Sequence, residues 1–138
     1  MIQRAIDFAR EKHKGQKDDC GKDYFEAHCF VVHQILKLLN VDDNLVCAGL
    51  LHDTLEDTDT TYEELVEEFN QDIAELVKEV SHKGKKDNYG YYYPNLKTER
   101  GITLKFADRL SNLSRMDCWD KGRKKQYLGK SKFWNSSK

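Results

Sequence analysis

The fold is decided by residues 44–57, N-L-V-C-A-G-L-L-H-D-T-L-E-D, in a chain of 138 residues. The spacing of apolar residues predicts one helix over this stretch, apolar on most of its sides as far as residue 51. Because a helix that is apolar nearly all round must be covered by other elements, we expect it at the centre of a helical bundle.

The same periodicity predicts further helices on both sides of this central one. They are expected over residues 2–15, 25–39, about 61–69, 72–80 and 97–113. Capping boxes at Thr60 and Thr61 mark the start of one, and Asp72 is the expected cap of the next. Residues 84–95 are predicted to form a surface loop, and the tail after residue 116 at most short helical pieces. The predicted fold class is all-α, a single-domain bundle over residues 1–138.

The composition excludes several classes of protein. With 23 Lys+Arg against 24 Asp+Glu, the net charge of −1 provides no basic surplus for duplex nucleic acid or an anionic membrane. No apolar run is long enough to cross a membrane, and no signal peptide opens the chain. The four cysteines have neither CxxC nor zinc-knuckle spacing and are expected to be free thiols, which suits a reducing compartment. The predicted location is cytoplasmic.

The end of the central helix carries an unusual cluster of charge. Asp53, Glu56 and Asp57 crowd its last turn beside His52, where the helix dipole is negative and favours cations. These carboxylates repel the helix end and one another, so a divalent cation is the simplest partner. A solvated acidic helix end remains the alternative at this point.

A second polar group interrupts an apolar run near the end of the last predicted helix. Asp108 lies within residues 104–113, where burying an unpaired carboxylate would be costly. Asn112 follows one turn later on the same face, so the two polar groups are expected to share a partner. His28 taken alone is weaker evidence, because a single histidine on an amphipathic helix is more often a hydrogen-bonded core residue.

The order of these residues along the chain, His28, then His52-Asp53, then Asp108, resembles the pattern of the HD superfamily of metal phosphohydrolases. Within that superfamily it resembles the RelA/SpoT-type alarmone hydrolase domain. The matching stretches are residues 9–16 (A-R-E-K-H-K-G-Q), His28, residues 50–58 (L-L-H-D-T-L-E-D-T) and residues 104–113 (L-K-F-A-D-R-L-S-N-L). The resemblance is strongest over residues 1–116.

The resemblance implies a role for each matching residue. The metal ligands would be His28, His52, Asp53 and Asp108, holding a divalent ion that in this family is commonly Mn²⁺. Glu56 and Asp57 would orient and deprotonate the attacking water, and Asn112 would contact the substrate beside the metal. The implied reaction removes the 3′-pyrophosphate of ppGpp or pppGpp.

The sequence also departs from the family pattern around the expected nucleotide site. Asp18 and Asp19 stand where the family usually has basic residues that hold the guanine nucleotide. Lys17 and Lys83 are predicted to supply the missing cation. The Pro-Tyr pair expected before the first ligand histidine appears as Tyr24-Phe25. Tyrosines in residues 89–93 could stack on a base, or pack against the core or another subunit.

The predicted function is therefore a metal-dependent phosphohydrolase acting on a small-molecule nucleotide, most simply on guanosine alarmones. Asp18 and Asp19 favour an alternative, an HD-type phosphatase with a different nucleotide substrate. A metal-containing nucleotide-binding module without turnover is the third reading, and Glu56 and Asp57 argue against it. No synthetase-like segment is visible, so the resemblance implies a stand-alone hydrolase, and assembly into a homo-oligomer stays open.

Overall fold

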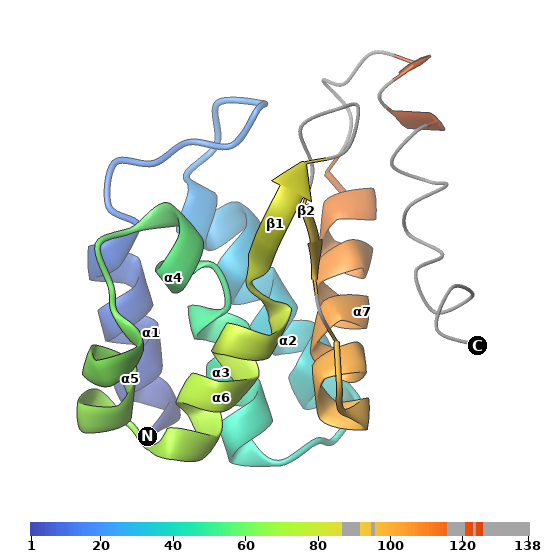
Figure 1. Cartoon of the computed structure of the whole chain (residues 1–138). Helices are drawn as coiled ribbons and strands as arrows, with labels where there is room; N and C mark the ends of the chain where they lie inside the picture. The colour runs from blue at the N-terminus through green and yellow to red at the C-terminus, as the bar shows by residue number, and fades with distance from the viewer. Residues whose placement is uncertain (87–91, 95, 116–120, 123, 126–138) are drawn as a thin grey trace.

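The chain folds into helices that surround one central helix, α3 (Asp43–Leu51) (Figure 1). The computed structural model describes residues 1–86, 92–94, 96–115, 121–122 and 124–125, and of residues 82–86 and 92–94 only the backbone. The other helices are α1 (Ile2–Lys12), the π-helix η1 (Phe25–Cys29) that continues into α2 (Phe30–Leu38), α4 (Thr54–Asp57), α5 (Tyr62–Glu68), α6 (Gln71–Val80) and α7 (Glu99–Leu113).

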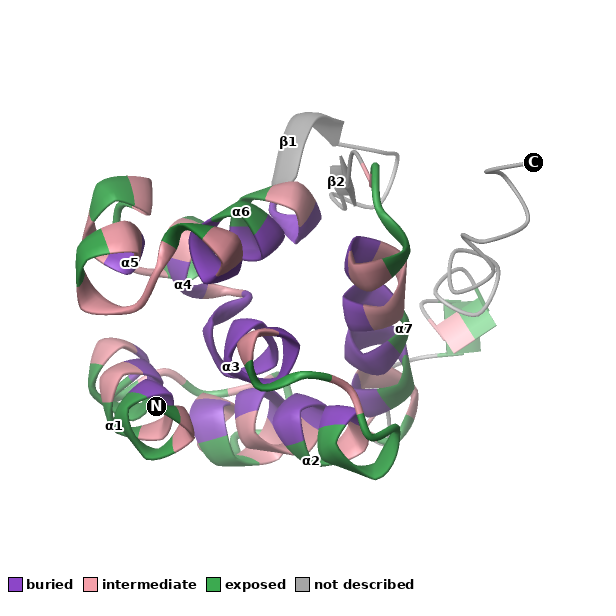
Figure 2. Ribbon diagram, turned by 90° about the horizontal axis from the view of Figure 1, so that it is seen from below, coloured by how far each residue is buried: buried purple, intermediate pink, exposed green. Residues whose placement is uncertain are grey.

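The central position predicted for α3 is confirmed. Residues 45–51 are all buried, and α3 packs against α1, α2, α6 and α7 (Figure 2). Gly49 brings α3 close to α2, because a Cβ at this position would run into the Leu36 side chain and lie 3.3 Å from Cγ1 of Val32. The predicted bundle of the HD-domain type is therefore built around the stretch that carries the His-Asp pair.

The prediction of one continuous helix over residues 44–57 is wrong. Helix α3 ends at Leu51, His52 and Asp53 form a turn, and the short α4 begins at Thr54. The Thr54 hydroxyl donates to the Leu51 carbonyl at 2.7 Å, which satisfies one of the acceptors left free at the end of α3. Apolar periodicity does not show this break because Leu55 continues the pattern beyond it.

Side-chain caps fix the starts of the outer helices. Thr61 accepts from the Glu64 amide and so begins α5, as one of the two predicted capping boxes requires. Helix α6 is capped by Asn70, which accepts from the Ile73 amide at 2.8 Å, so the predicted cap Asp72 is wrong. Asp72 lies inside the first turn of α6, where its side chain pairs with Arg100 instead.

A two-stranded ribbon occupies part of the segment predicted as a loop. Strands β1 (His82–Lys86) and β2 (Tyr92–Pro94) pair antiparallel, with His82 opposite Pro94 and Lys86 opposite Tyr92. The sequence does not predict these strands because residues 82–86, H-K-G-K-K, show no alternation of apolar and polar residues. The tyrosines predicted to stack or pack lie outside the residues whose side chains are described.

Some predictions about single side chains also fail. The apolar periodicity of residues 97–113 predicts Phe106 and Leu110 in the core, but each is 37 % exposed on α7. Cys29 and Cys47 are free and buried as expected, whereas Cys20 is disulfide-bonded, so the free-thiol prediction is wrong for that residue. Cys118 lies outside the described residues. Among the described helices, none has the length and apolar character that crossing a membrane requires.

Candidate metal centre

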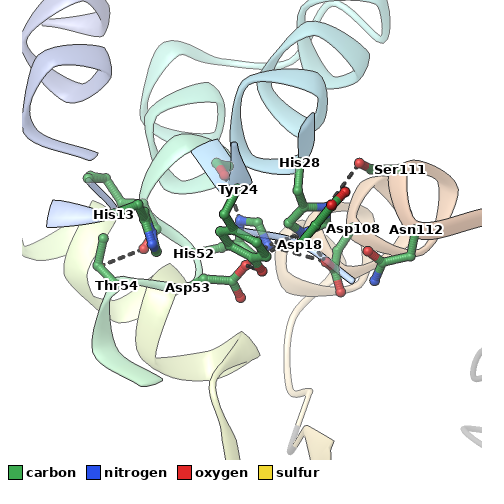
Figure 3. Close-up of polar contacts among 12 residues, drawn as sticks. His13, Asp18, Tyr24, His28, His52, Asp53, Thr54, Asp108, Ser111 and Asn112 are labelled. Carbon is green, nitrogen blue, oxygen red and sulfur yellow. Dashed lines mark hydrogen bonds and ion pairs between the residues drawn. The ribbon is translucent and has the colours of Figure 1, made fainter. Parts of the chain in front are cut away.

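Four side chains from three parts of the chain each direct one ligand-type atom toward the same region (Figure 3). His28 Nε2 lies 3.0 Å from His52 Nε2 and 2.8 Å from Asp108 Oδ1. His52 Nε2 lies 3.2 Å from the same Asp108 oxygen and 3.1 Å from Asp53 Oδ2. Asp53 Oδ2 is 3.5 Å from His28 Nε2. These are the four residues that the sequence predicted as metal ligands.

The break between α3 and α4 explains how two consecutive residues can face the same point. On a regular helix, neighbouring side chains project about 100° apart and do not meet. His52 ends α3 and Asp53 begins α4, and in the turn between them His52 Nε2 and Asp53 Oδ2 approach to 3.1 Å. The turn that the sequence analysis missed is therefore the feature that makes the His-Asp pair a possible chelating unit.

His28 comes from the π-helix η1, which precedes α2 without a gap. A π-turn holds one more residue than an α-turn and recurs at functional sites. Here it places His28 in the interior, where its side chain is 1 % exposed. Asp108 reaches the same point from the opposite side, because it lies on the buried face of α7.

Outer contacts fix both imidazole rings. His52 Nδ1 lies 2.7 Å from the Gly49 carbonyl, which can only accept, so Nδ1 carries the proton. In the neutral ring the Nε2 lone pair then faces the centre. His28 Nδ1 lies 2.9 Å from the Ser111 hydroxyl on α7. Contacts of this kind orient histidines that bind metals.

The second oxygen of Asp108 has a partner of its own. Lys105, which is buried one turn earlier on α7, places Nζ 3.0 Å from Asp108 Oδ2. Burial alone would raise the pKa of Asp108, but the Lys105 charge and the two histidines outweigh it and hold the pKa well below its usual value. Asp108 is therefore an ionised carboxylate with one oxygen on Lys105 and the other directed at the centre.

The centre favours positive charge. Burial lowers the pKa of His28, as expected for an imidazole away from water. Burial would also lower the pKa of His52, but the carboxylates of Asp53 and Asp108 outweigh it and raise the pKa well above the usual value. The same pairing with His52 lowers the pKa of Asp53 against the effect of burial. The two carboxylates thus attract a cation to this point.

The donor set fits a divalent ion. His28, His52 and Asp108 each offer a ligand atom, all within 4.8 Å of one another, and Asp53 adds a second carboxylate oxygen. For metal–ligand bonds of about 2.1 Å, adjacent ligands at right angles lie about 3 Å apart, which is the spacing found here. The two imidazoles and Asp108 therefore have the spacing of ligands to one ion, and Asp53 lies beside them.

The predicted catalytic pair lies on α4, the short helix that follows Asp53. Desolvation and the negative charge of Asp53 raise the pKa of Asp57 to about 6. The Asp57 carbonyl accepts from Gln16 Nε2 at 2.9 Å, which ties the end of α4 to the segment after α1. Glu56 is exposed on the same short helix. Neither carboxylate is among the four converging groups.

The three residues predicted to contact the substrate lie in different segments of the chain. Asn112 lies one turn beyond Asp108 on α7, as the sequence predicts, and its Oδ1 accepts from Arg115 Nη2 at 2.7 Å. Lys17 is exposed, and its backbone forms a bridge with Asp23. Lys83 lies in β1, and its side chain is outside the described part of the structure. Their contact with a substrate stays a prediction.

Three contributors to the site were missed in the sequence. Lys105 and Ser111 lie on the same face of α7 as Asp108, three residues before and after it. That spacing was visible as polar residues inside an apolar run. Tyr24, whose hydroxyl donates to Asp53 at 2.5 Å, was noted only as a departure from the family pattern. No local pattern connects it with Asp53, 29 residues away.

A comparison with known protein families shows to which family the chain belongs. The family model described as "HD domain" matches residues 5–90, which include three of the four converging residues. The chain belongs to the HD domain family. The resemblance predicted from the sequence is thereby confirmed, and the HD pair of the name corresponds to His52-Asp53.

Individual relatives give a more specific comparison than the family model does. The chain is 44 % identical over 120 residues to a guanosine-3′,5′-bis(diphosphate) 3′-pyrophosphohydrolase of Aquifex aeolicus. This alignment covers 81 % of this HD chain but 17 % of the relative. It is 38 % identical over 123 residues to the protein of that name from Spiroplasma citri, covering 16 % of the relative. The chain thus spans about a sixth of these bacterial relatives. It covers 79 % of a relative of the same activity, MESH1 of Xenopus tropicalis, at 32 % identity over 141 residues.

A solved structure agrees with the fold. A metazoan orthologue of SpoT, described as hydrolysing ppGpp and playing a role in starvation responses, superposes with a TM-score of 0.79 at 26 % identity. The match covers 95 % of this HD chain and 81 % of the other. The helical bundle therefore belongs to a known architecture.

Proposed function

We propose that this HD domain is a metal-dependent phosphohydrolase that removes the 3′-pyrophosphate of guanosine alarmones, ppGpp or pppGpp. The observation that carries the proposal is the convergence of His28, His52 and Asp108, whose ligand atoms lie 2.8–3.2 Å apart, with Asp53 Oδ2 3.1 Å from His52 Nε2 and 3.5 Å from His28 Nε2. Relatives of matching sequence are named for this activity, and one of them is covered over 79 % of its length. The proposed domain covers residues 1–138.

In this proposal the four converging residues hold one divalent ion. When bound, such an ion lowers the pKa of water and offsets negative charge on phosphoryl oxygens. Glu56 and Asp57, beside the centre on α4, take up the proton of the attacking water. Asn112, on the same face of α7 as Asp108, contacts the substrate next to the reacting phosphate.

A different nucleotide is the second candidate substrate. Asp18 occupies a position where a cation was expected, and its carboxylate faces Arg115 Nη1 at 3.4 Å. The side chain of Asp18 is 1 % exposed, so it presents little negative charge to a ligand. The acidic residue at position 18 favours a contact with the nucleobase that differs from the family pattern. It does not alter the residues of the metal centre.

A substrate panel tests the proposal and its alternative. Purified protein would be incubated with Mn²⁺ and ppGpp, NADPH or deoxynucleoside monophosphates, and pyrophosphate and orthophosphate would be measured. We expect pyrophosphate and GDP from ppGpp. Orthophosphate from monophosphates would favour the second candidate. Absence of turnover with every substrate, despite bound Mn²⁺, would overturn the enzymatic proposal in favour of a binding module.

Three finer predictions accompany this proposal. Mn²⁺ is the proposed ion, because mixed imidazole and carboxylate ligands suit it. A small nucleotide is the proposed partner, in a cytoplasmic location, with assembly into a homo-oligomer left open. Metal analysis of the purified protein and its mass in solution would check the first and last of these.

A further inference from the structure

Tyr24 contacts the metal centre through a single short hydrogen bond. Its hydroxyl donates to Asp53 Oδ2 at 2.5 Å. This is the oxygen that faces His28 and His52, not the second oxygen of the carboxylate. A carboxylate oxygen has two lone pairs, so it can accept from Tyr24 and still face an ion.

Asp53 has few other supports within the described residues. It begins α4 without a side-chain capping bond, and its contacts other than Tyr24 are with the two histidines of the centre itself. Its position in a turn leaves its side chain less constrained than one inside a helix. A donor outside the four ligands is therefore well placed to set the direction of the carboxylate.

Aromatic and cationic groups fix the ring of Tyr24. The rings of His13 and His28 lie 5.4 and 5.5 Å from it, centroid to centroid. The guanidinium carbon of Arg115, at the end of α7, lies 5.6 Å from the ring centroid, within cation–π distance. The Tyr24 amide donates to the Gln16 carbonyl at 2.9 Å. The ring is thus held on several sides.

Asp18 explains why Arg115 lies against this ring. Its Oδ2 is 3.4 Å from Arg115 Nη1, while Arg115 Nη2 donates to Asn112. Asp18 is itself fixed, because its Oδ1 accepts from the backbone amides of Cys20 and Lys22 at 2.9 and 2.8 Å. The acidic residue that departed from the family pattern is therefore an anchor for Arg115.

We propose that Tyr24 is a positioning residue for Asp53, and that Arg115, anchored by Asp18, holds the Tyr24 ring in place for this role. The contacts form a connected series from the turn at residues 18–22, through Arg115 and Tyr24, to the Asp53 oxygen that faces the centre. The inference rests on the metal site of the proposed function. It adds that the hydroxyl of Tyr24 sets the affinity for the ion.

The affinity for Mn²⁺, measured by calorimetry on metal-free protein, tests the inference without any activity assay. Tyr24→Phe removes only the hydroxyl, and we expect Mn²⁺ to bind about 10- to 100-fold more weakly, as is usual for the loss of an outer contact. The melting temperature of the metal-free protein should stay close to that of the wild type. Tyr62→Phe is the matched control, because Tyr62 donates to Glu75 at 2.7 Å on α5 and α6. It should leave the affinity unchanged.

Arg115→Met tests the second half of the inference. We expect a smaller loss of affinity than with Tyr24→Phe, and no further loss when the two substitutions are combined, because Arg115 acts through Tyr24. Additive losses would overturn the role of Arg115. Unchanged affinity in Tyr24→Phe, with wild-type protein that binds Mn²⁺, would overturn the positioning role and leave the proposed function standing. Failure of the wild type to bind Mn²⁺ would overturn both.

Discussion

The two ends of α3 both gather charged side chains, but they differ in how the charge is compensated. At its start, Asp42 and Asp72 both pair with Arg100 at 2.8 Å, and we name these three residues the Arg100 cluster. The side chains of the cluster are 39–52 % exposed. At the other end, the side chains of the metal centre are at most 15 % exposed.

The difference shows what distinguishes a binding site from a surface network. In the Arg100 cluster a guanidinium occupies the point on which the carboxylates converge, so the protein supplies its own cation. At the metal centre two carboxylates and two imidazole nitrogens converge, and Lys105 contacts the outer oxygen of Asp108. Among the described residues no lysine or arginine is seen to pair with the atoms that face the centre, and converging buried carboxylates and imidazoles are what a divalent ion requires.

The largest effect should come from removing a ligand. We expect Asp108→Asn to weaken Mn²⁺ binding by more than about 100-fold and to abolish hydrolysis. The loss should exceed the roughly 10- to 100-fold effect of removing a residue that only contacts a ligand. His52→Asn is the second variant, because it removes a different ligand atom and leaves both carboxylates in place. Calorimetry with Mn²⁺ and far-ultraviolet circular dichroism would be measured together. A folded variant with wild-type affinity would contradict the ligand assignment.

Glu56 tests the chemistry separately from binding. We expect Glu56→Gln to lower kcat by about 10²- to 10⁴-fold, the usual contribution of a general base, with Mn²⁺ affinity nearly unchanged. Glu63→Gln on α5 is the matched control, since it removes an exposed carboxylate near a helix start. Full activity in Glu56→Gln would show that its assigned role is wrong.

Bound metal should stabilise the fold as well. At a free Mn²⁺ concentration of about 100 times the dissociation constant, binding should add about 2.7 kcal/mol to the free energy of unfolding. For a chain of this size that raises Tm by roughly 10 °C. Thermal melts with Mn²⁺ and with excess chelator would measure the difference. An equal Tm under both conditions would mean that the ion does not bind the folded state more tightly than the unfolded chain.

The Arg100 cluster should give the smallest effect, and one that depends on pH. Hydrogen bonds from Arg100 lower the pKa of Asp72, and they outweigh burial to lower that of Asp42. Because these values lie below 3.8, the value in the unfolded chain, the stabilisation is present at neutral pH and is lost as the pH falls through them.

Arg100→Met measures this contribution. We expect it to cost at most about 1 kcal/mol at pH 7, as for other exposed pairs, and less at pH 3. Urea unfolding at the two pH values gives the comparison, and Mn²⁺ affinity at neutral pH should not change. A cost that grows as the pH falls would contradict the assigned pairing.

The sequence predicts the fold and the ligands on different grounds. The set of four ligands follows from the resemblance to the HD superfamily, whereas the fold follows from the apolar periodicity. Residues 45–51 are apolar on every face, which places them at the centre, and the charged residues that follow have to be near that centre. The turn at His52 and Asp53 and the contact from Tyr24 could not be predicted, because both depend on tertiary structure. The ribbon of β1 and β2 is a similar case, since backbone pairing leaves no periodicity in H-K-G-K-K.

The most direct test of the metal centre is an anomalous difference map, recorded at the manganese edge from crystals of this protein soaked in Mn²⁺. We predict one strong peak about 2.0–2.3 Å from His28 Nε2, His52 Nε2, an Asp53 oxygen and an Asp108 oxygen. A map with no peak at this point, or with the ion bound away from Asp108, would contradict the account.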